Sequence, residues 1–453
     1  MTKLRFTRPT RNLLMLLIAI CTFVLPHLSI VISQIAKAQE ENPSVKAADL
    51  DAAFATEWMQ MLYGRVEAEK ISPPAASRVY AYAGVTLYEA VLAGMPGFNS
   101  LAGQLTDMPD MPELPDEKAI YDWPASADAA LAVTLKGLMS ADSVSAIDAL
   151  RTTHLAGRTQ ATNAEVVKRS VDYGESIGKA ILDWAAKDGY KEAESKPYEL
   201  PKGDASTYIL TTPGTKPNEP YWGTLRTFAL QSTNLCDVQP SMKFDTDPSS
   251  TFYAQAMEVK TTRDNLTEEQ KAIANFWVDT AGITGTPGGH WVSIENQVVI
   301  QQHIKLDWAA GMYALVGVAL GDAFIACWNL KYEVLLLRPE TYIKQYIRRS
   351  WAPYIQTPPF PEYPSGHSVA SAAAAEVLTK HLGTVAFKDD THKIHNMPAR
   401  FFTSFEAAAQ EAAISRLYGG IHYRAAIENG LRQGHCIGSI VLSRIQLKPR
   451  LNG

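Results

Sequence analysis

The sequence of 453 residues predicts an all-α protein, and three observations support this fold class. Apolar residues recur at spacings of three and four over several long segments, which is the periodicity of an amphipathic helix. Alternation of apolar and polar residues, which indicates a half-buried strand, is almost absent. The composition, with 46% hydrophobic and 20% charged residues, is that of a globular chain large enough for one large core or two joined cores.

The N-terminus has the order of an export signal. Four basic residues precede an unbroken apolar run from Leu13 to Leu25, and Ala36-Lys37-Ala38 has the small-x-small pattern that a signal peptidase cleaves. We therefore expect residues 1–38 to be a signal peptide and the mature chain to be exported, either periplasmic or secreted. The alternative is a retained membrane anchor, because apolar residues resume from Leu28 to Ile35. Pro26-His27 interrupts that stretch, however, and its uninterrupted part is short for a bilayer that needs about 20 residues.

Cleavage of the signal would make the chain more acidic. The full sequence carries 42 Lys and Arg residues against 47 Asp and Glu residues, and residues 1–38 contain five basic residues and no acidic one. The mature chain would therefore carry 37 basic against 47 acidic residues, a formal charge of −10. Such a surface does not suit nucleic acid or anionic lipid headgroups, so we expect neither as a partner. A second uninterrupted apolar span of about 20 residues is not evident, so we expect no stable membrane span after cleavage.

Helices can be placed along the chain from their periodicity and their start signals. Thr267 with Gln270, and Thr403 with Glu406, are typical of capping boxes that open helices. Helical periodicity is strongest in residues 77–94, 164–189 and 306–336.

One boundary is suggested by composition. A polar stretch rich in proline and glycine runs from Glu192 to Pro220, and irregular sequence follows to about Asp264. We therefore divide the mature chain into an N-terminal helical region, residues 39–264, and a C-terminal catalytic helical region, residues 265–453. The alternative is a long loop within a single globule.

Cysteine usage is uninformative about metals. Cys21 leaves with the signal, and Cys236, Cys327 and Cys436 are an odd number without CxxC or metal-like spacing, so at most one disulfide is possible. Cys327 and Cys436 stand in apolar runs, where we expect small buried hydrophobes. Neither a carboxylate cage nor a paired Cys/His set indicates a divalent metal site.

The segment KYEVLLLRP, residues 331–339, places two cations seven residues apart. On a helix of 3.6 residues per turn, Lys331 and Arg338 would project from one face, two turns apart. Such pairs are common on solvated faces. Here three leucines lie between the two cations and an apolar helix precedes them, so this face is not clearly the solvated one.

The segment PSGH, residues 364–367, stands at the expected first turn of a helix, where amide groups lack partners and carry a partial positive charge. Such a turn can bind an anion. Ser365 can donate its hydroxyl, Gly366 lets an oxyanion approach the backbone, and His367 can exchange a proton near pH 7. The simpler alternative is a serine N-cap with an incidental histidine.

The segment SRLYGGIH, residues 415–422, repeats this chemistry. Arg416 would end one helix, Gly419-Gly420 would break it, and His422 would stand near the start of the next. Together the three segments supply three cations, two neutral donors and two imidazoles, which are the groups that bind a tetrahedral or trigonal-bipyramidal oxyanion.

These motifs, in this order over residues 331–422, resemble the signature of the superfamily that joins vanadium-dependent haloperoxidases, type 2 phosphatidic acid phosphatases and bacterial acid phosphatases. Other segments resemble the bacterial exported haloperoxidase branch: FWVDTAGITGTPGGHW at 276–291, Trp328, Phe360 within PPFPEYPSGH, and residues 78–105. The likeness thus covers most of the mature chain. It implies an all-helical fold of two four-helix bundles, with vanadate held at the end of one bundle.

The resemblance also implies roles for single residues. His422 would be the axial nitrogen ligand of vanadium, His367 the acid-base residue, and Lys331 the group that polarises peroxide. Hydrogen peroxide, a halide and an organic acceptor would be the substrates, hypohalous acid the product, and phosphate would occupy the same site as vanadate. Asp279, His290, Trp328 and Phe360 would surround the site. The residues that bind the cofactor vanadate would be Lys331, Arg338, Ser365, Gly366, Arg416 and His422.

One position departs from the family pattern. The family commonly places an aspartate four residues after the second histidine, and this chain has Ala426 there, with Glu428 and Asp279 as candidate substitutes. A missing carboxylate should hurt a nucleophilic histidine more than a metal-ligating one, which favours a haloperoxidase. The alternatives are an exported phosphatase with a phosphohistidine intermediate and no cofactor, and a non-catalytic oxyanion-binding protein.

Overall fold

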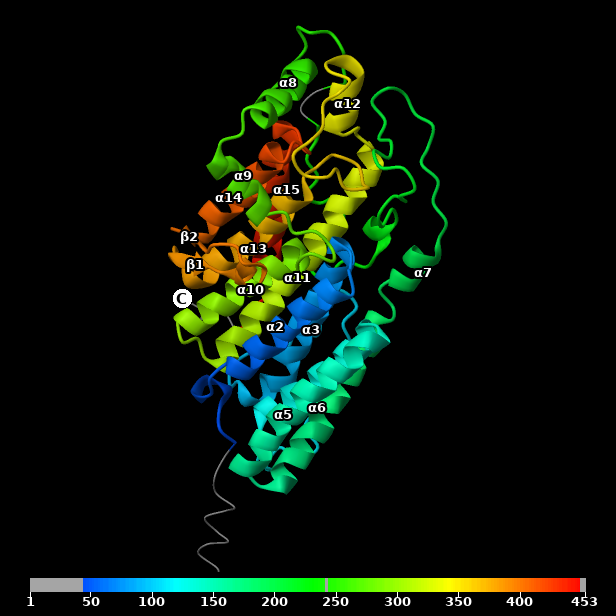
Figure 1. Ribbon diagram of the computed structural model, residues 1–453. Helices are drawn as coiled ribbons and strands as arrows, with labels where there is room; N and C mark the ends of the chain where they lie inside the picture. The colour runs from blue at the N-terminus through cyan, green and yellow to red at the C-terminus, as the bar shows by residue number, and fades with distance from the viewer. Residues whose placement is uncertain (1–43, 241–242, 449–453) are drawn as a thin grey trace, which may run out of the picture. The chain divides into compact units, whose positions relative to one another are not determined.

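The computed structural model describes residues 44–240 and 243–448 (Figure 1). The signal peptide expected at residues 1–38 lies outside these residues. The chain divides into two compact units, one of Met1–Ser44 with Asp116–Ile120 and the other of Val45–Pro115 with Tyr121–Gly453. In the first unit, the described part is a turn in which the Lys118 N–H donates to Asp116 Oδ1 at 2.9 Å. All helices and strands named below belong to the second unit.

The second unit confirms the all-α prediction: its described residues form fourteen α helices and only two short strands. The 3-10 helices are η1 (Ala47–Asp49), η2 (Leu92–Gly94), η3 (Ala141–Ser143), η4 (Trp222–Thr224) and η5 (Thr391–His395), and the strands are β1 (Phe387–Asp389) and β2 (Arg400–Phe402). The α helices are α2 (Ala53–Ala68), α3 (Pro73–Val91), α4 (Trp123–Leu138), α5 (Val144–Ala161), α6 (Ala164–Ala185), α7 (Tyr190–Ser195), α8 (Thr251–Asp264), α9 (Glu268–Phe276), α10 (Thr286–Gln301), α11 (Leu306–Val334), α12 (Pro339–Tyr346), α13 (Gly366–Leu382), α14 (Phe405–Tyr418) and α15 (Arg424–Arg444).

Helix α8 and the two strands were not anticipated. Helix α8 lies in the stretch before Asp264 that was expected to be irregular, and Ser250 caps it by accepting a hydrogen bond from the Tyr253 N–H at 3.1 Å. Strands β1 and β2 form an antiparallel hairpin of three residues each, too short for an alternating pattern to show. The division of the mature chain at residue 264 stays a prediction.

Side-chain caps set where several helices begin. The capping box of α9 is confirmed, with the Gln270 N–H donating to Thr267 Oγ1 at 3.2 Å and the Thr267 N–H to Gln270 Oε1 at 3.0 Å. The second expected box is wrong: Ser404, not Thr403, is the N-cap of α14 and accepts from the Ala407 N–H at 3.0 Å. Both hydroxyls have the chemistry of a cap, and only the backbone path decides between them.

The helices form two groups of four, in agreement with the expected pair of bundles, and the long helix α11 of the second group packs against α3 of the first (Figure 1). Helices α3, α4, α5 and α6 contact one another in the first group, and α11, α13, α14 and α15 do so in the second. α11 also crosses α3 at close range, because a Cβ on Gly84 would lie 2.2 Å from the Tyr313 carbonyl oxygen and one on Gly317 would lie 2.8 Å from that of Tyr80. Among the described residues, α11 is long and apolar enough to cross a membrane, but its apolar window is entirely buried inside the protein.

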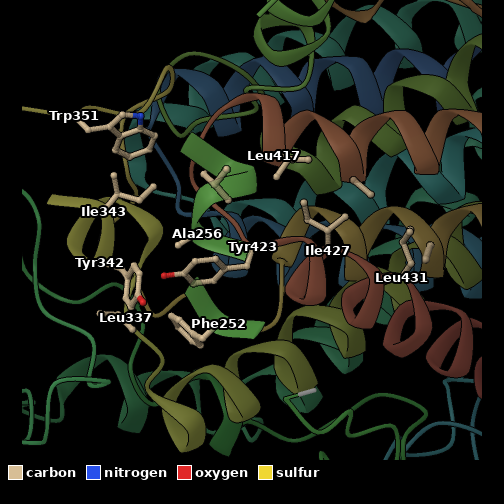
Figure 2. Packing of buried hydrophobic residues seen from close by; sticks show 13 residues of the cluster. Phe252, Ala256, Leu337, Tyr342, Ile343, Trp351, Leu417, Tyr423, Ile427 and Leu431 are labelled. Atoms are coloured by element: carbon tan, nitrogen blue, oxygen red, sulfur yellow. The ribbon is translucent and has the colours of Figure 1, made fainter. Parts of the chain in front are cut away.

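A cluster of apolar side chains packs beside the C-terminal group of helices (Figure 2). Leu337 and Tyr423 belong to this cluster and are fully buried, together with Phe252 of α8 and Tyr342 of α12. Leu337 directly precedes Arg338, and Tyr423 directly follows His422. The packing of the cluster therefore fixes the backbone from which these two site residues extend.

One disulfide joins distant parts of the second unit. Cys236, in the loop before α8, is bonded to Cys436 of α15, 200 residues away in sequence. Cys327 is free and buried in α11, as expected. The expectation that Cys436 is only a small buried hydrophobe is wrong, because the residue is half-buried and its sulfur is bonded to Cys236.

Candidate functional site

Residues of the PSGH and SRLYGGIH segments line one cavity of ≈ 300 Å³, whereas Lys331, Arg338 and Ser365 are buried and are not among its lining residues. Two loop segments close it, one following α9 and one preceding α13. Of the predicted site residues, the cavity is lined by Asp279, Trp328, Phe360, Gly366, His367, Arg416 and His422.

Lys331 and Arg338 do not lie on one helix, which corrects the expectation drawn from their spacing. Helix α11 ends at Val334 because Leu335 adopts the left-handed conformation, with φ of 51°. Its carbonyl accepts from the Tyr208 N–H at 2.7 Å, so a distant loop takes over the backbone pairing. Arg338 is the N-cap of the next helix, α12, and both cations are fully buried.

Lys331 extends from the last turn of α11 into the loop that precedes α13. Its ammonium donates to the carbonyls of Pro361 at 3.0 Å and Glu362 at 3.1 Å, and lies 5.6 Å from the ring centre of Trp328 and 5.1 Å from that of Phe360. Burial lowers the pKa of Lys331 to about 7. An anion beside this ammonium would therefore favour its charged form.

The two arginines are held by backbone carbonyls rather than carboxylates. Arg338 donates from Nε to the Phe360 carbonyl and from Nη1 to the Ile421 carbonyl, both at 2.9 Å, and its buried Nη2 has no partner among the described residues. Arg416 of α14 donates to the Trp277 carbonyl. Burial lowers the pKa of each arginine to about 10. Within the described part of the chain no carboxylate accepts a hydrogen bond from either guanidinium, so both charges lack a bonded counter-ion.

The PSGH segment forms the N-terminus of α13 as expected. Ser365 is the N-cap, and its hydroxyl accepts from Ser368 Oγ at 2.9 Å, which leaves its own hydrogen for another acceptor. A Cβ on Gly366 would lie 3.3 Å from the Trp328 ring, so the glycine keeps the first turn open. His367 has an unpartnered Nε2, and burial together with Arg416 lowers its pKa well below the usual value. It is therefore a neutral base at neutral pH.

His422 lies between α14 and α15, after the break at Gly420, whose φ is 77°. Arg338 Nη1 lies 3.1 Å from His422 Nε2, and since a guanidinium can only donate, Nε2 is the acceptor. The proton is then on Nδ1, which donates to Glu362 Oε1 at 2.9 Å. Burial and the neighbouring Arg338 lower the pKa of His422 well below its usual value, so the imidazole is neutral.

Glu362 is the functional residue that the sequence reasoning missed. It is fully buried, and its Oε1 also accepts from the Tyr423 N–H at 2.9 Å. Burial raises its pKa to about 7. The two candidates named for this role are wrong, because Asp279 bonds to His290 and Glu428 is exposed on α15. The signal available in the sequence was an acidic residue between a proline and a tyrosine, five positions before His367.

Ala426 is also explained by the structure. Its side chain is buried against Leu330 and Tyr363, and its carbonyl accepts from the Ser365 N–H at 3.1 Å. A larger, charged side chain at 426 would have to displace this packing, so the carboxylate partner of His422 comes from a different segment.

The other surrounding residues divide into two sets. Trp328 and Phe360 pack with ring centres 4.9 Å apart and line the cavity beside Lys331. Asp279 lines the cavity too, but its Oδ2 pairs with His290 Nδ1 at 2.9 Å. His290 is fully buried behind it and is not among the lining residues.

An all-α chain that places a buried arginine, a helix N-terminus and two neutral imidazoles around one cavity, with two further buried cations nearby, has the groups that oxyanion-binding proteins use. The comparison with known proteins specifies the family: the chain belongs to the vanadium haloperoxidase superfamily. Residues 311–449 match the VCPO second helical-bundle domain. The crystal structure of a bacterial vanadium-dependent iodoperoxidase is similar with a TM-score of 0.82 and 35% identity, over 88% of this chain and 98% of that one.

Two further relatives are more distant. Vanadium chloroperoxidase from Curvularia inaequalis is 26% identical over 278 residues, and the match spans 45% of each protein, less than half of that relative's length. An apo-type bacterial vanadium-dependent chloroperoxidase shares the fold, with a TM-score of 0.61 and 13% identity over 81% of this chain and 92% of that one.

Proposed function

We propose that this protein is a vanadate-dependent haloperoxidase that oxidises a halide, iodide by preference, with hydrogen peroxide. The halide loses two electrons and gains one peroxide oxygen, the O–O bond breaks, and the other oxygen leaves as water after protonation. The observation that carries the proposal is a cavity lined by Arg416 and two neutral imidazoles, with Lys331 and Arg338 buried against its lining residues, in a chain 35% identical to an iodoperoxidase over 88% of its length.

The residues present fit vanadate. Arg338 Nη2 and His367 Nε2 are buried polar atoms without a described partner, which is costly unless a ligand binds them. The cations Lys331, Arg338 and Arg416, with the donors Ser365 and Gly366, would neutralise and hold its oxygens. When bound, vanadate supplies a Lewis acid that activates peroxide without changing its own oxidation state.

Two histidines would have different duties. Glu362 keeps the proton of His422 on Nδ1, so Nε2 carries the lone pair. That lone pair accepts from Arg338 Nη1 here, and it would become the ligand atom once vanadate replaced Arg338 as the partner of Nε2. His367 is neutral, and its unpartnered Nε2 would take the proton from hydrogen peroxide as a general base. Lys331 would supply a positive charge to the peroxide oxygen that becomes negative as the O–O bond breaks.

A phosphatase with a phosphohistidine intermediate is the second candidate, and Glu362 is the observation that favours it. A carboxylate 2.9 Å from Nδ1 would stabilise the positive charge that a nucleophilic histidine develops. The absence of a carboxylate at Ala426 therefore no longer separates the two activities.

The deciding experiment compares the two activities on one preparation. Protein stripped of anions and reconstituted with orthovanadate should halogenate an activated carbon acid with hydrogen peroxide and iodide, and less well with bromide, whereas the anion-free form should hydrolyse phosphate monoesters poorly. His422→Ala should lose vanadate affinity and activity together. His367→Ala should keep vanadate affinity and lose about 10²- to 10⁴-fold in turnover. Efficient phosphatase turnover without vanadate, and no halogenation with it, would reject the haloperoxidase.

A further inference from the structure

A buried group of charged side chains lies behind Asp279 and has no part in the reaction proposed above. It consists of Asp279 from the loop after α9, His290 of α10, Asp389 at the end of β1 and His392 of η5. These residues are between 0% and 2% exposed. Two histidines and two aspartates from four separate segments therefore converge in the interior.

Asp279, His290 and Asp389 are joined by hydrogen bonds, and the ligand atoms of Asp279, His290 and His392 also lie close enough together to hold a metal ion. One ligand atom each of Asp279, His290 and His392 lies within 4.8 Å of the others. Asp279 Oδ2 is 2.9 Å from His290 Nδ1, and Asp279 Oδ1 is 3.5 Å from His392 Nε2. Ligand atoms around a tetrahedral zinc ion are about 3.3 Å apart, since each is about 2.0 Å from the metal.

The two ring nitrogens of His392 are the atoms in this group that most need a ligand. It is 1% exposed, and neither of its ring nitrogens has a hydrogen-bond partner among the described residues. An unpaired buried polar group costs about 1–3 kcal/mol, so native structures rarely keep one without a bound water or ion.

His290 has the partner that a metal-ligating histidine usually has. Its Nε2 lies 2.9 Å from Asp389 Oδ2, while Asp389 Oδ1 accepts from the Thr391 N–H at 3.0 Å. A carboxylate in this place fixes the ring and leaves Nδ1 for the metal. Two ionised aspartates and one protonated His290 give the group a net charge of about −1. A divalent cation that replaces the Nδ1 proton of His290 would make the group neutral.

We propose that Asp279, His290 and His392 form a binding site for a divalent transition-metal cation such as zinc, with Asp389 orienting His290. The two imidazoles and one carboxylate are a ligand set that suits zinc and its neighbours rather than calcium or magnesium. The cation would tie the loop after α9 to α10 and η5. That loop carries the Trp277 carbonyl that accepts from Arg416, so the cation would be a structural support for one wall of the cavity.

The test measures metal binding without any assay of activity. Chelator-treated protein, free of vanadate and phosphate, is titrated with zinc, and cobalt is used as a spectroscopic probe. We expect one cation per chain by mass spectrometry after gel filtration, visible absorption of a four-coordinate cobalt complex, and a melting temperature raised by about 3 °C at a hundredfold excess over Kd.

His392→Ala should lose the thermal response to zinc, whereas His303→Asn should keep it. His303 is an exposed histidine in a left-handed conformation that asparagine also tolerates. If His392→Ala does not fold, the metal content and cobalt spectrum of the wild type decide. Substoichiometric metal with no thermal shift in the wild type, or an equal shift in His392→Ala, would overturn the proposal.

Discussion

Replacing Glu362 by glutamine tests how the site prepares His422. The carboxylate Oε1 accepts two buried N–H groups at 2.9 Å, from His422 Nδ1 and from the Tyr423 backbone. Glutamine keeps the size and one acceptor oxygen but removes the charge. A hydrogen bond to a charged group contributes about 1 kcal/mol more than one between neutral groups, so the two bonds together lose about 2 kcal/mol.

The Tyr423 bond is the same with and without vanadate, so its loss cancels in the affinity, whereas the Nδ1–H of His422 becomes a stronger donor once Nε2 binds the vanadium. Replacing residues that orient metal-ligating histidines typically weakens binding 10- to 100-fold, which corresponds to about 1.4 to 2.7 kcal/mol. We therefore expect Glu362→Gln to bind orthovanadate about 10 to 100 times more weakly in isothermal titration calorimetry. Glu428→Gln, which removes an exposed carboxylate of α15, should bind like the wild type.

Phosphate provides a control that separates two effects of Glu362, its fixing of the His422 tautomer and its negative charge. Removing a buried negative charge beside Lys331 and Arg338 should by itself strengthen the binding of any anion. Phosphate needs no bond to a histidine nitrogen, so its affinity for Glu362→Gln should stay the same or rise. Vanadate affinity within threefold of the wild type, or an equal loss for both anions, would refute the role assigned to Glu362.

Three further predictions concern charge, packing and processing. Because burial lowers the pKa of Lys331 to about 7 in the anion-free protein, anion binding must restore its proton at higher pH. Affinity for sulfate, whose own charge is constant in this range, should be full below pH 7 and fall up to about tenfold per pH unit above it. Calorimetry of Lys331→Met should show a shallower slope, because only Glu362, whose pKa burial raises to about 7, then changes charge in this range. Gly84→Ala places a Cβ 2.2 Å from the Tyr313 carbonyl oxygen and should destabilise the protein by about 3 kcal/mol or more in denaturant unfolding. Gly157→Ala, with no atom within 4 Å of the new Cβ, should instead be neutral or stabilising by up to about 1 kcal/mol. N-terminal sequencing of exported protein should begin near Gln39, and an intact N-terminus in a membrane fraction would reject the cleaved signal.

The helices were predictable from the sequence because their periodicity is local, but the exact ends were not. Helix α11 shows why: nothing in the leucine-rich run marks Leu335 as left-handed, and leucine rarely adopts that conformation. The turn is imposed by backbone pairing of residues 206–208 with residues 335–337, including the Leu337 N–H donating to the Ser206 carbonyl at 2.9 Å. Arg338 thus reaches His422 by a path that helical spacing did not describe.

The candidate site was predictable to the extent that its residues stand at helix ends in recognisable motifs. Ser365, Gly366 and His422 occupy the positions that their neighbouring sequence indicated. Glu362 and His392 could not be placed in the same way, because loops and a 3-10 helix bring them to partners 60 and 113 residues away in sequence, His422 and Asp279. No periodicity connects such residues, and only tertiary contacts bring them together.

The bond between Cys236 and Cys436 makes the stability of this chain a property of its surroundings as well as of its sequence. By the loop-entropy estimate, closing a segment of 200 residues restricts the unfolded chain by about 5 kcal/mol. That amount is comparable to the whole net stability of many proteins. Protein produced in a reducing cytosol would lack this constraint, so recombinant material made there should melt earlier and be degraded faster than material oxidised before purification.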